Sequence, residues 1–409
     1  MRRWSRRSII AGAAASLACG PGAKAAVPAL RRGINLWPWF ALTREFPAPR
    51  SDYAWPPWQM QRPVPRQADL QKLAAAGLDF VRLPVDPGPF LAFAGAQRQT
   101  LLDELFRAVA NCQASGLAVV VNIQANEATH YWNSARMHAT VDAERFGDYR
   151  GLVADIAAGL ARFDPARTLL EPVNEPPGEC AGSAWPKAQN ALLAAARAAA
   201  PALPLVATGG CGSMIRGLEA LDPAGIPVAG PLLYTFHFYE PYLFTHQGAP
   251  WMREPVYRAL NSVPWPGAAG ELETTLNAVR QRMEREGGIN PVVYAETGRV
   301  LKEYFDAQPD RRFVAGYFAK VMAWATRHNI PARQILVGEF GALRTDSRYT
   351  AAAVHDRARY IRDVREVAEG CGFAWSFWNL FDGMGLMDDA TRELDPAIVE
   401  ALGLVMPKF

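Results

Sequence analysis

Short runs of consecutive apolar residues alternate along the chain with longer stretches whose apolar positions recur every three or four residues. The first pattern is typical of strands buried on both faces, and the second of amphipathic helices. Eight strands are predicted, at residues 33–37, 80–85, 117–124, 169–174, 205–208, 232–238, 335–339 and 373–378. Helices are predicted between most of them, at residues 66–76, 99–114, 143–162, 185–199, 311–328 and 350–369.

This alternation predicts an α/β protein with a parallel sheet, and eight repeats favour a closed (β/α)8 TIM barrel in a single domain. The alternative is an open doubly wound sheet, but no glycine-rich dinucleotide fingerprint follows the first strand. Residues 47–65 and 245–266 are expected to form long loops over one face of the barrel. A charged helix at residues 271–287 is expected to be inserted before the seventh strand.

The first 25 residues have a different character from the rest. Two arginine pairs come before a short apolar run that ends at Cys19, and Ala23-Lys24-Ala25 offers a small-x-small cleavage site. The segment resembles a twin-arginine (Tat) export signal, the alternative being a basic tail. Its removal takes away five positive charges and no acidic ones, so the formal net charge changes from +3 to −2. The mature chain is therefore expected to be residues 26–409, with no basic patch for nucleic acid.

Four cysteines lie outside that segment, and none has the spacing of a metal site. Cys180 and Cys211 each lie in a glycine-rich segment directly after a predicted strand. In an oxidising compartment such a pair can form a disulfide. Sequence does not determine pairing, so this disulfide is a hypothesis.

Polar and aromatic residues gather at the ends of the predicted strands. Because the C-terminal ends of barrel strands all open on one face, these side chains are expected to meet in one site. They are Asn35, Trp37, Arg82, Gln124, Asn174, Glu175, His237, Tyr239, Glu339 and Trp378. Glu175 and Glu339 each close an apolar run, where an unpaired carboxylate is costly. Two such carboxylates suggest that one acts as an acid and the other as a nucleophile.

The same residues fall into short motifs with a fixed order along the chain. These are Gly33-Ile34-Asn35, Phe80-Val81-Arg82-Leu83-Pro84, Asn174-Glu175-Pro176, Thr235-Phe236-His237-Phe238-Tyr239, Gly338-Glu339-Phe340-Gly341 and Trp375-Ser376-Phe377-Trp378. Together they resemble glycoside hydrolase family 5, the cellulase-like barrels. The resemblance extends over most of the chain, from Gly33 to Asn379. It implies a (β/α)8 barrel that carries catalytic glutamates on its fourth and seventh strands.

The resemblance also implies the chemistry of the two glutamates. Glu175 would be the general acid/base and Glu339 the nucleophile, in a retaining mechanism whose carboxyl groups lie about 5–5.5 Å apart. Arg82 would keep Glu339 ionised through its charge and a hydrogen bond. Glu175 would start protonated, because partial burial and a neighbouring carboxylate raise its pKa.

The remaining residues at the strand ends would bind and orient. Asn174 would hydrogen-bond the sugar 2-hydroxyl. His237 and Tyr239 would orient the two carboxylates, and Trp378 would form the floor of the subsite where the sugar ring distorts. Asn35, Trp37 and Gln124 complete the expected substrate-binding set. A chain with twelve tryptophans can supply such stacking surfaces, although many of them are expected in the core.

One position departs from the family pattern. Family members usually carry Asp-x-His at the end of the third strand, where this chain has Asn122-Ile123-Gln124. Glutamine donates and accepts hydrogen bonds but cannot carry a proton charge. Four further carboxylates compete with the chosen pair: Glu127, Glu171, Glu240 and Glu296. Glu171 is expected on the barrel exterior because strand side chains alternate, and Glu296 lacks the buried strand context of Glu339.

The sequence thus predicts a retaining glycosidase that cleaves a β-linked glucan, with an endo-β-1,4-glucanase as the leading hypothesis. The alternatives are a β-mannanase, a β-1,3-glucanase, an exopolysaccharide hydrolase, and a non-catalytic polysaccharide-binding barrel. No cofactor or metal is expected, since clustered His and Asp ligands are lacking. A serine nucleophile is not expected either, because the sequence has no Gly-x-Ser-x-Gly elbow. We expect a periplasmic or secreted monomer whose partner is a polysaccharide, without stable membrane insertion.

Overall fold

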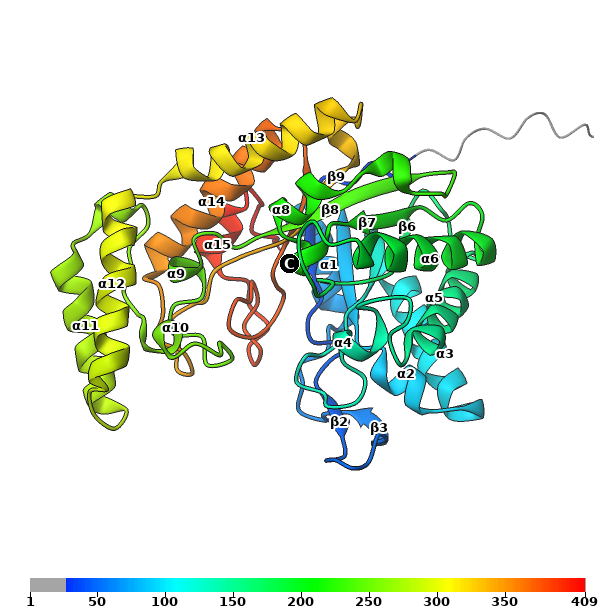
Figure 1. Cartoon of the computed structure of the whole chain (residues 1–409), viewed down its shortest axis with the longest axis horizontal. Coiled ribbons are helices and arrows are strands. Elements are labelled where there is room, and N and C mark those ends of the chain that lie inside the picture. Colours follow the sequence, from blue (N-terminus) through cyan, green and yellow to red (C-terminus); the bar gives the residue numbers. More distant parts are fainter. Residues whose placement is uncertain (1–26, 409) are drawn as a thin grey trace, which may run out of the picture.

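Eight parallel strands form a closed barrel in a computed structural model that describes residues 27–408 (Figure 1). The predicted export signal at residues 1–25 lies outside the described residues. Around the barrel the order is β1-β10-β9-β8-β7-β6-β5-β4. The strands are β1 (Arg32–Asn35), β4 (Phe80–Val85), β5 (Ala118–Ile123), β6 (Thr168–Glu171), β7 (Leu205–Thr208), β8 (Leu232–Phe238), β9 (Ile335–Phe340) and β10 (Ala374–Phe377). The predicted (β/α)8 barrel is confirmed.

Alternation of side chains along each strand creates two apolar layers. On β4, Val81, Leu83 and Val85 pack in the large core between the barrel and the helices. Phe80 belongs instead to a small cluster inside the barrel, to which most strands contribute one residue: Leu30, Phe80, Ala118, Val120, Leu169, Val206, Leu233, Leu336 and Ala374. This inner cluster fills the lower part of the barrel, so the polar side chains are left for the C-terminal end.

Helices enclose the barrel, as Figure 1 shows for α5 and α6 on one side and α13 and α14 on another. The six predicted helices are confirmed as α1 (Gln67–Ala76), α3 (Gly95–Ala114), α5 (Phe146–Leu160), α6 (Ala184–Ala199), α13 (Arg311–Arg327) and α14 (Val354–Gly370). Short helices complete the shell: α2 (Gly88–Ala92), α4 (Ser134–Met137), α7 (Gly210–Ser213), α8 (Ile215–Ala220), α9 (Tyr242–Thr245), α10 (Pro255–Ala259) and α15 (Pro396–Ala401). Among the described residues, no helix combines the length and apolar character needed to cross a membrane.

The insertion before β9 is larger than predicted. The expected charged helix is α11 (Leu272–Arg285), and a second helix, α12 (Pro291–Ala307), follows it. The two lie together at one end of the molecule (Figure 1). Asn290 caps α12 by accepting hydrogen bonds from the backbone N–H groups of Val292 and Val293. An asparagine cap followed by a proline, here Pro291, is a helix start signal that can be recognised in the sequence. The apolar periodicity of α12 is weak, however, because only a few of its residues are buried.

Two segments expected to be loops contain regular structure. Residues 47–65 include β3 (Tyr53–Trp58), which pairs antiparallel with β2 (Thr43–Glu45). This strand was not predicted because it contains Pro56 and Pro57, and proline argues against a strand in the middle of a sheet. In a two-stranded ribbon both strands are edges, where proline is tolerated. Residues 245–266 include α10. The loop prediction was therefore wrong at these two places.

Candidate active site

A bulge between β8 and β9 brings Glu339 beside His237. Phe236 pairs with Val337, but the next residue, His237, pairs with Glu339, so Gly338 is the extra residue on β9. Bulges of this kind re-aim side chains and are frequent next to active sites. A Cβ atom at Gly338 would lie 2.5 Å from Thr235 Oγ1 and 3.1 Å from His237 Nε2. The bulge therefore requires glycine, because any side chain would displace the histidine.

Replacement of Gly338 with alanine is expected to lower kcat by about 10²-fold, since a displacement of about 1 Å in a catalytic group has this effect. Hydrolysis rates and thermal unfolding of the purified variant would be measured together. Gly316→Ala is the matched control, because a Cβ at this exposed position of α13 meets nothing within 4 Å. Equal activity of the two variants would contradict the assignment of Gly338 to the site.

Arg82 lies at the centre of a buried polar network. Its Nη1 donates to Glu339 Oε1 at 2.7 Å and to Asn35 Oδ1 at 2.9 Å. Its Nε and Nη2 donate to the two oxygens of Glu171 at 2.7 and 2.8 Å, and Nη2 also donates to Asn174 Oδ1 at 2.6 Å. Arg82 and Glu171 are fully buried. The bidentate pair with Glu171 fixes the guanidinium plane, and this plane in turn aims Nη1 at Glu339.

The placement of Glu171 corrects the sequence interpretation. Glu171 lies inside the barrel as a partner of Arg82, whereas alternation from Asn174 had assigned it to the exterior. Strand β6 ends at Glu171, and the irregular backbone from Pro172 onward breaks the alternation. Glu296, another of the competing carboxylates, lies on α12 and pairs with Arg299 on the surface. Because both residues lie on the inserted helix α12, Glu296 is not part of the barrel site.

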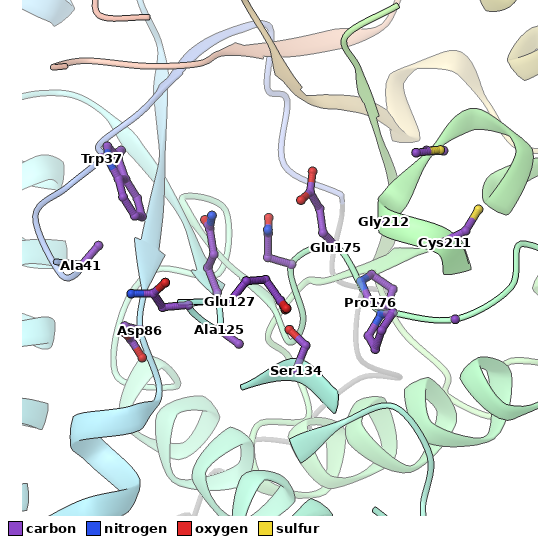
Figure 2. Close-up of a pocket in the computed structure, with 16 residues that line it drawn as sticks. Trp37, Ala41, Asp86, Ala125, Glu127, Ser134, Glu175, Pro176, Cys211 and Gly212 are labelled. Atoms are coloured by element: carbon purple, nitrogen blue, oxygen red, sulfur yellow. The ribbon is translucent and has the colours of Figure 1, made fainter. Parts of the chain in front are cut away.

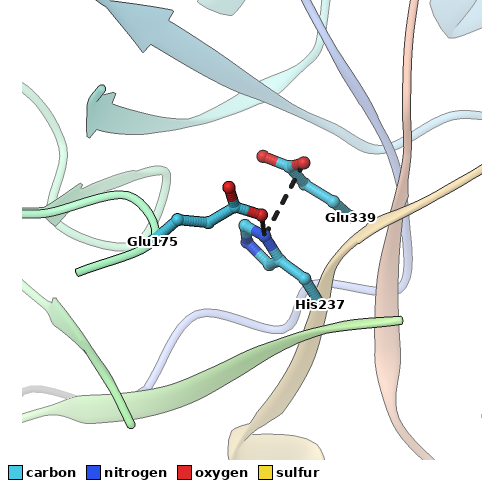
Figure 3. Close-up of side chains that lie close together, drawn as sticks. All are labelled: Glu175, His237 and Glu339. Carbon is cyan, nitrogen blue, oxygen red and sulfur yellow. Dashed lines mark hydrogen bonds and ion pairs between the residues drawn. The ribbon is translucent and has the colours of Figure 1, made fainter. Parts of the chain in front are cut away.

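Glu175, His237 and Glu339 meet at the C-terminal mouth of the barrel (Figure 3). His237 Nδ1 lies 2.7 Å from Glu175 Oε1 and 3.6 Å from Glu339 Oε2. The hydroxyl of Tyr239 donates to Glu339 Oε2 at 2.9 Å. A carboxylate oxygen of Glu175 and one of Glu339 lie within 4.8 Å of each other. Glu339 is nearly buried, with a side-chain exposure of 5%, whereas 42% of the Glu175 side chain is exposed.

Titration of the three groups is linked. Burial would lower the pKa of His237, but the charges of Glu339 and Glu175 raise it above its ordinary value. Burial and the Glu175 carboxylate raise the pKa of Glu339, against the opposing effects of His237 and Arg82. Burial would raise the pKa of Glu175 as well, but the His237 hydrogen bond and the positive charges lower it below its ordinary value.

This result corrects the expectation of a raised pKa for Glu175. The sequence analysis gave His237 an orienting role, but it did not include the effect of this contact on the pKa of Glu175. At 2.7 Å, Glu175 and His237 behave as a coupled pair that holds one proton between them. The lowered pKa of Glu175 and the raised pKa of His237 favour the proton on His237 when the pair holds one.

Glu175, His237 and Glu339 are also spaced as ligands of a metal ion could be, because one donor atom of each lies within 4.8 Å of the others. The sequence had offered no such cluster. One of these carboxylates is already paired with the Arg82 guanidinium, whose positive charge opposes a bound cation. The expectation that no metal is used stays a prediction.

A cavity of about 550 Å³ opens beside this cluster (Figure 2). Trp37, Gln124, Asn174 and Glu175 line it, as the sequence predicted for residues of one site. The ring of Trp378 lies 5.6 Å from that of Trp37. Gln124 Oε1 is buried and has no hydrogen-bond partner among the described residues. The structure thus brings all ten predicted site residues to one end of the barrel.

The cavity also contains residues that sequence reasoning did not select. They include Asp86, Asn126, Glu127, Cys211 and Gly212. Asp86 directly follows β4, so the rule that found the other strand ends would have found it. Burial without a cationic partner raises its pKa to about 7. Cys211 had been considered only as a disulfide candidate, and the structure confirms its bond to Cys180.

A closed (β/α)8 barrel with two adjacent carboxylates at its C-terminal mouth is the arrangement of a glycoside hydrolase. The family model "Cellulase (glycosyl hydrolase family 5)" matches residues 43–383. The chain therefore belongs to glycoside hydrolase family 5 and is a cellulase-like glycosidase.

Two characterised relatives are similar over part of the chain. Endoglucanase 3 of Fibrobacter succinogenes is 23% identical over 173 residues, which are 42% of this chain and 23% of that protein. Cellodextrinase A of Ruminococcus flavefaciens is 22% identical over 186 residues, which are 46% of this chain and 54% of that protein. The matches thus span about a quarter and about half of the relatives' lengths.

Solved structures share the fold over 91% of this chain. The cellulose synthase subunit Z of Clostridioides difficile has a TM-score of 0.64 at 20% identity and is covered over 99% of its length. Thermotoga maritima Cel5A in complex with cellobiose has a TM-score of 0.63 at 19% identity, with 97% coverage. The same Cel5A has also been solved with mannotriose, with a TM-score of 0.62. At these identities the likeness concerns the barrel fold.

Proposed function

We propose that this chain is a retaining endo-β-1,4-glucanase in which Glu339 is the nucleophile and Glu175 the general acid/base. The observation that carries the proposal is the separation of the two carboxylates, whose nearest oxygens lie within 4.8 Å. Retaining glycosidases need about 5–5.5 Å between the carboxyl groups, and inverting enzymes about 6.5–9.5 Å to admit a water molecule. The observed spacing supports the retaining geometry.

In the first step Glu339 attacks the anomeric carbon while the leaving oxygen takes a proton from Glu175. Arg82 and Tyr239 hold one oxygen of Glu339 each, at 2.7 and 2.9 Å, which fixes the direction of attack. The proton that Glu175 donates reaches it from His237 across their 2.7 Å contact, so departure of the leaving group leaves Glu175 ionised and His237 neutral. In the second step Glu175, now ionised, accepts a proton from the water that hydrolyses the glycosyl-enzyme.

The pH profile follows from these assignments. Glu339 must be ionised and has a raised pKa, so the acid limb of kcat/KM is expected above the ordinary glutamate value of about 4.3. The Glu175–His237 pair must hold a proton, and the pKa of His237 is raised, so the alkaline limb is expected above about 6.5. Activity is lost below the first limb and above the second.

A His237→Asn variant tests this assignment. It leaves the proton on the Glu175 carboxyl alone, so the alkaline limb is expected to move to lower pH, whereas His355→Asn, at an exposed position of α14, is expected to leave the profile unchanged. Rates between about pH 4 and about pH 9 would be measured for both variants. An unmoved alkaline limb in His237→Asn would contradict the shared proton.

The substrate proposal draws on the names of similar proteins. The two relatives are named an endoglucanase and a cellodextrinase, which supports a β-glucan chain or its fragments as the substrate. Cel5A has been solved with cellobiose and also with mannotriose, which supports mannan as a second candidate substrate. The likeness to a cellulose synthase subunit supports a third candidate, the trimming of a cell's own exopolysaccharide.

Release of reducing ends by the mature chain tests the function. The panel would contain carboxymethylcellulose, mixed-linkage β-glucan, laminarin and mannan, each beside Glu175→Gln and Glu339→Gln. We expect cleavage of the first two polymers, loss of activity in both variants, and a fall in viscosity before many ends appear, as endo-cleavage requires. Binding of a polymer without release of ends would favour the polysaccharide-binding alternative.

Export through the twin-arginine route is part of the same proposal. The Cys180–Cys211 disulfide supports it, because disulfides persist in oxidising compartments and are rare in the bacterial cytosol. Fractionation of expressing cells would locate the chain, and replacement of Arg6 and Arg7 with lysine is expected to retain it in the cytoplasm.

A further inference from the structure

We propose that the Cys180–Cys211 disulfide positions the Glu175 carboxyl, so that reduction of this bond lowers catalysis. The inference rests on the proposed role of Glu175 as the general acid/base. Cys211 and Gly212 line the same cavity as Glu175 and Pro176, and Figure 2 shows these four residues on one side of it. The disulfide therefore belongs to the wall that carries the carboxyl, and its effect is expected at the site.

Glu175 needs support from its surroundings. Its φ is 43°, in the left-handed region that side chains other than glycine rarely adopt. Such strain persists only where the surrounding structure holds it. Among the described residues, the carboxylate makes a single hydrogen bond, to His237, and 42% of the side chain is exposed. Packing around the side chain is thus limited, and its position depends on the backbone of the loop after β6.

That loop is tied to the segment after β7 at two points. Cys180 is bonded to Cys211, and the backbone N–H of Gly212 donates to the carbonyl of Pro176 at 2.9 Å. Pro176 is the residue that follows Glu175. Links this close to the carboxyl transmit a movement of the Cys211 segment directly to the backbone of Glu175.

The segment after β7 is itself strained and anchored to the barrel. Cys211, Gly212 and Ser213 have φ values of 49°, 70° and 57°, of which only the glycine adopts such a value readily. Thr208 Oγ1, at the end of β7, donates to the buried Ser213 Oγ at 2.9 Å. Without the disulfide, the hydrogen bond from Gly212 to Pro176 would be the only one left between the two loops among the described residues. These loops contain three strained residues, and a single hydrogen bond contributes less free energy than such strain costs.

Reduction of the disulfide is a two-electron step. A dithiol such as dithiothreitol supplies two electrons and two protons, the S–S bond breaks, Cys180 and Cys211 become thiols, and the dithiol closes to a cyclic disulfide. The two other cysteines of the described chain, Cys112 and Cys371, are free. A chain in a reducing compartment would accordingly be less active than one in an oxidising compartment.

The first test is kinetic and uses the double variant Cys180→Ser/Cys211→Ser and the wild type with and without dithiothreitol. Loss of the disulfide is expected to lower kcat on the best polymer by about 10- to 100-fold, because misplacement of a catalytic group acts on the rate. KM is expected to change less than kcat. With a dinitrophenyl cellobioside and added azide, which need neither an acid nor a base, the rate is expected to stay near that of the wild type. Cys371→Ser with dithiothreitol controls for other thiol effects.

The second test does not depend on activity. The pKa of His237 would be measured by NMR, with the signal assigned by His237→Asn. In the double variant it is expected to fall toward its value in Glu175→Gln, since Glu175 no longer lies beside the ring. An unchanged pKa in a folded double variant would overturn the inference, as would a kcat within twofold of the wild type. Inactivity of the wild type on every glycan would instead count against the proposed function. The NMR result would still show whether the disulfide positions the Glu175 carboxyl.

Discussion

Replacement of Glu339 with glutamine is expected to lower kcat on the best polysaccharide by about 10⁴-fold or more, with little change in KM, because the nucleophile acts on the rate and not on binding. Glutamine keeps the shape and can still accept the Arg82 hydrogen bond at Oε1, so the fold should persist. The measurement is steady-state hydrolysis at several enzyme concentrations, together with thermal unfolding to establish that the variant is folded.

Azide distinguishes the role of Glu339 from that of Glu175. In Glu339→Ala, azide can occupy the vacated space and attack an activated aryl glycoside directly, which gives a product of inverted configuration. In Glu175→Ala, azide attacks the glycosyl-enzyme instead and gives a product of retained configuration. Retained product from Glu339→Ala would contradict the assignment, and so would a Glu339→Gln variant within tenfold of the wild type.

The positions of the barrel strands and of most site residues could be predicted from local pattern alone. Buried parallel strands are continuous apolar runs, so residues such as those of β4 and β9 are recognisable without their neighbours. Strand ends meet on one face of any such barrel, and this rule assembled Arg82, Glu175 and Glu339 from distant parts of the chain. Asp86 directly follows strand β4, so the same rule applied to every strand end would also have placed it in the site.

The remaining features depend on contacts between elements that local pattern does not contain. The bulge at Gly338 arises from the pairing of β8 with β9 and decides that His237 faces Glu339. The interior position of Glu171 follows from the end of regular strand geometry at Pro172. The contact between His237 and Glu175 reverses the expected direction of the Glu175 pKa. For Gly338 and Glu175 a neighbour from another element determines the outcome, whereas for Glu171 the change of backbone geometry at Pro172 does so.

Arg82 connects the stability of the barrel to the chemistry of the site. It is the cation for two carboxylates, Glu171 and Glu339, in a place with almost no access to water. A buried ion pair contributes little when compared with apolar residues of the same volume, but removal of one partner leaves an uncompensated charge. The effect of substituting Arg82 is therefore expected to exceed that of removing an exposed arginine.

Replacement of Arg82 with methionine is expected to lower the free energy of unfolding by about 3–5 kcal/mol. It also removes a charge that lowers the pKa of Glu339, so the acid limb of kcat/KM should move to higher pH. Urea unfolding and the pH profile would measure the two effects. Arg299→Met, which breaks only surface pairs on α12, is the control and should change neither. The double variant Arg82→Met/Glu171→Met should recover part of the stability, because it removes one orphaned charge, and none of the activity, because Glu339 still lacks its cation. Equal stability of Arg82→Met and Arg299→Met would mean that the network around Arg82 is not needed to compensate the two buried carboxylates.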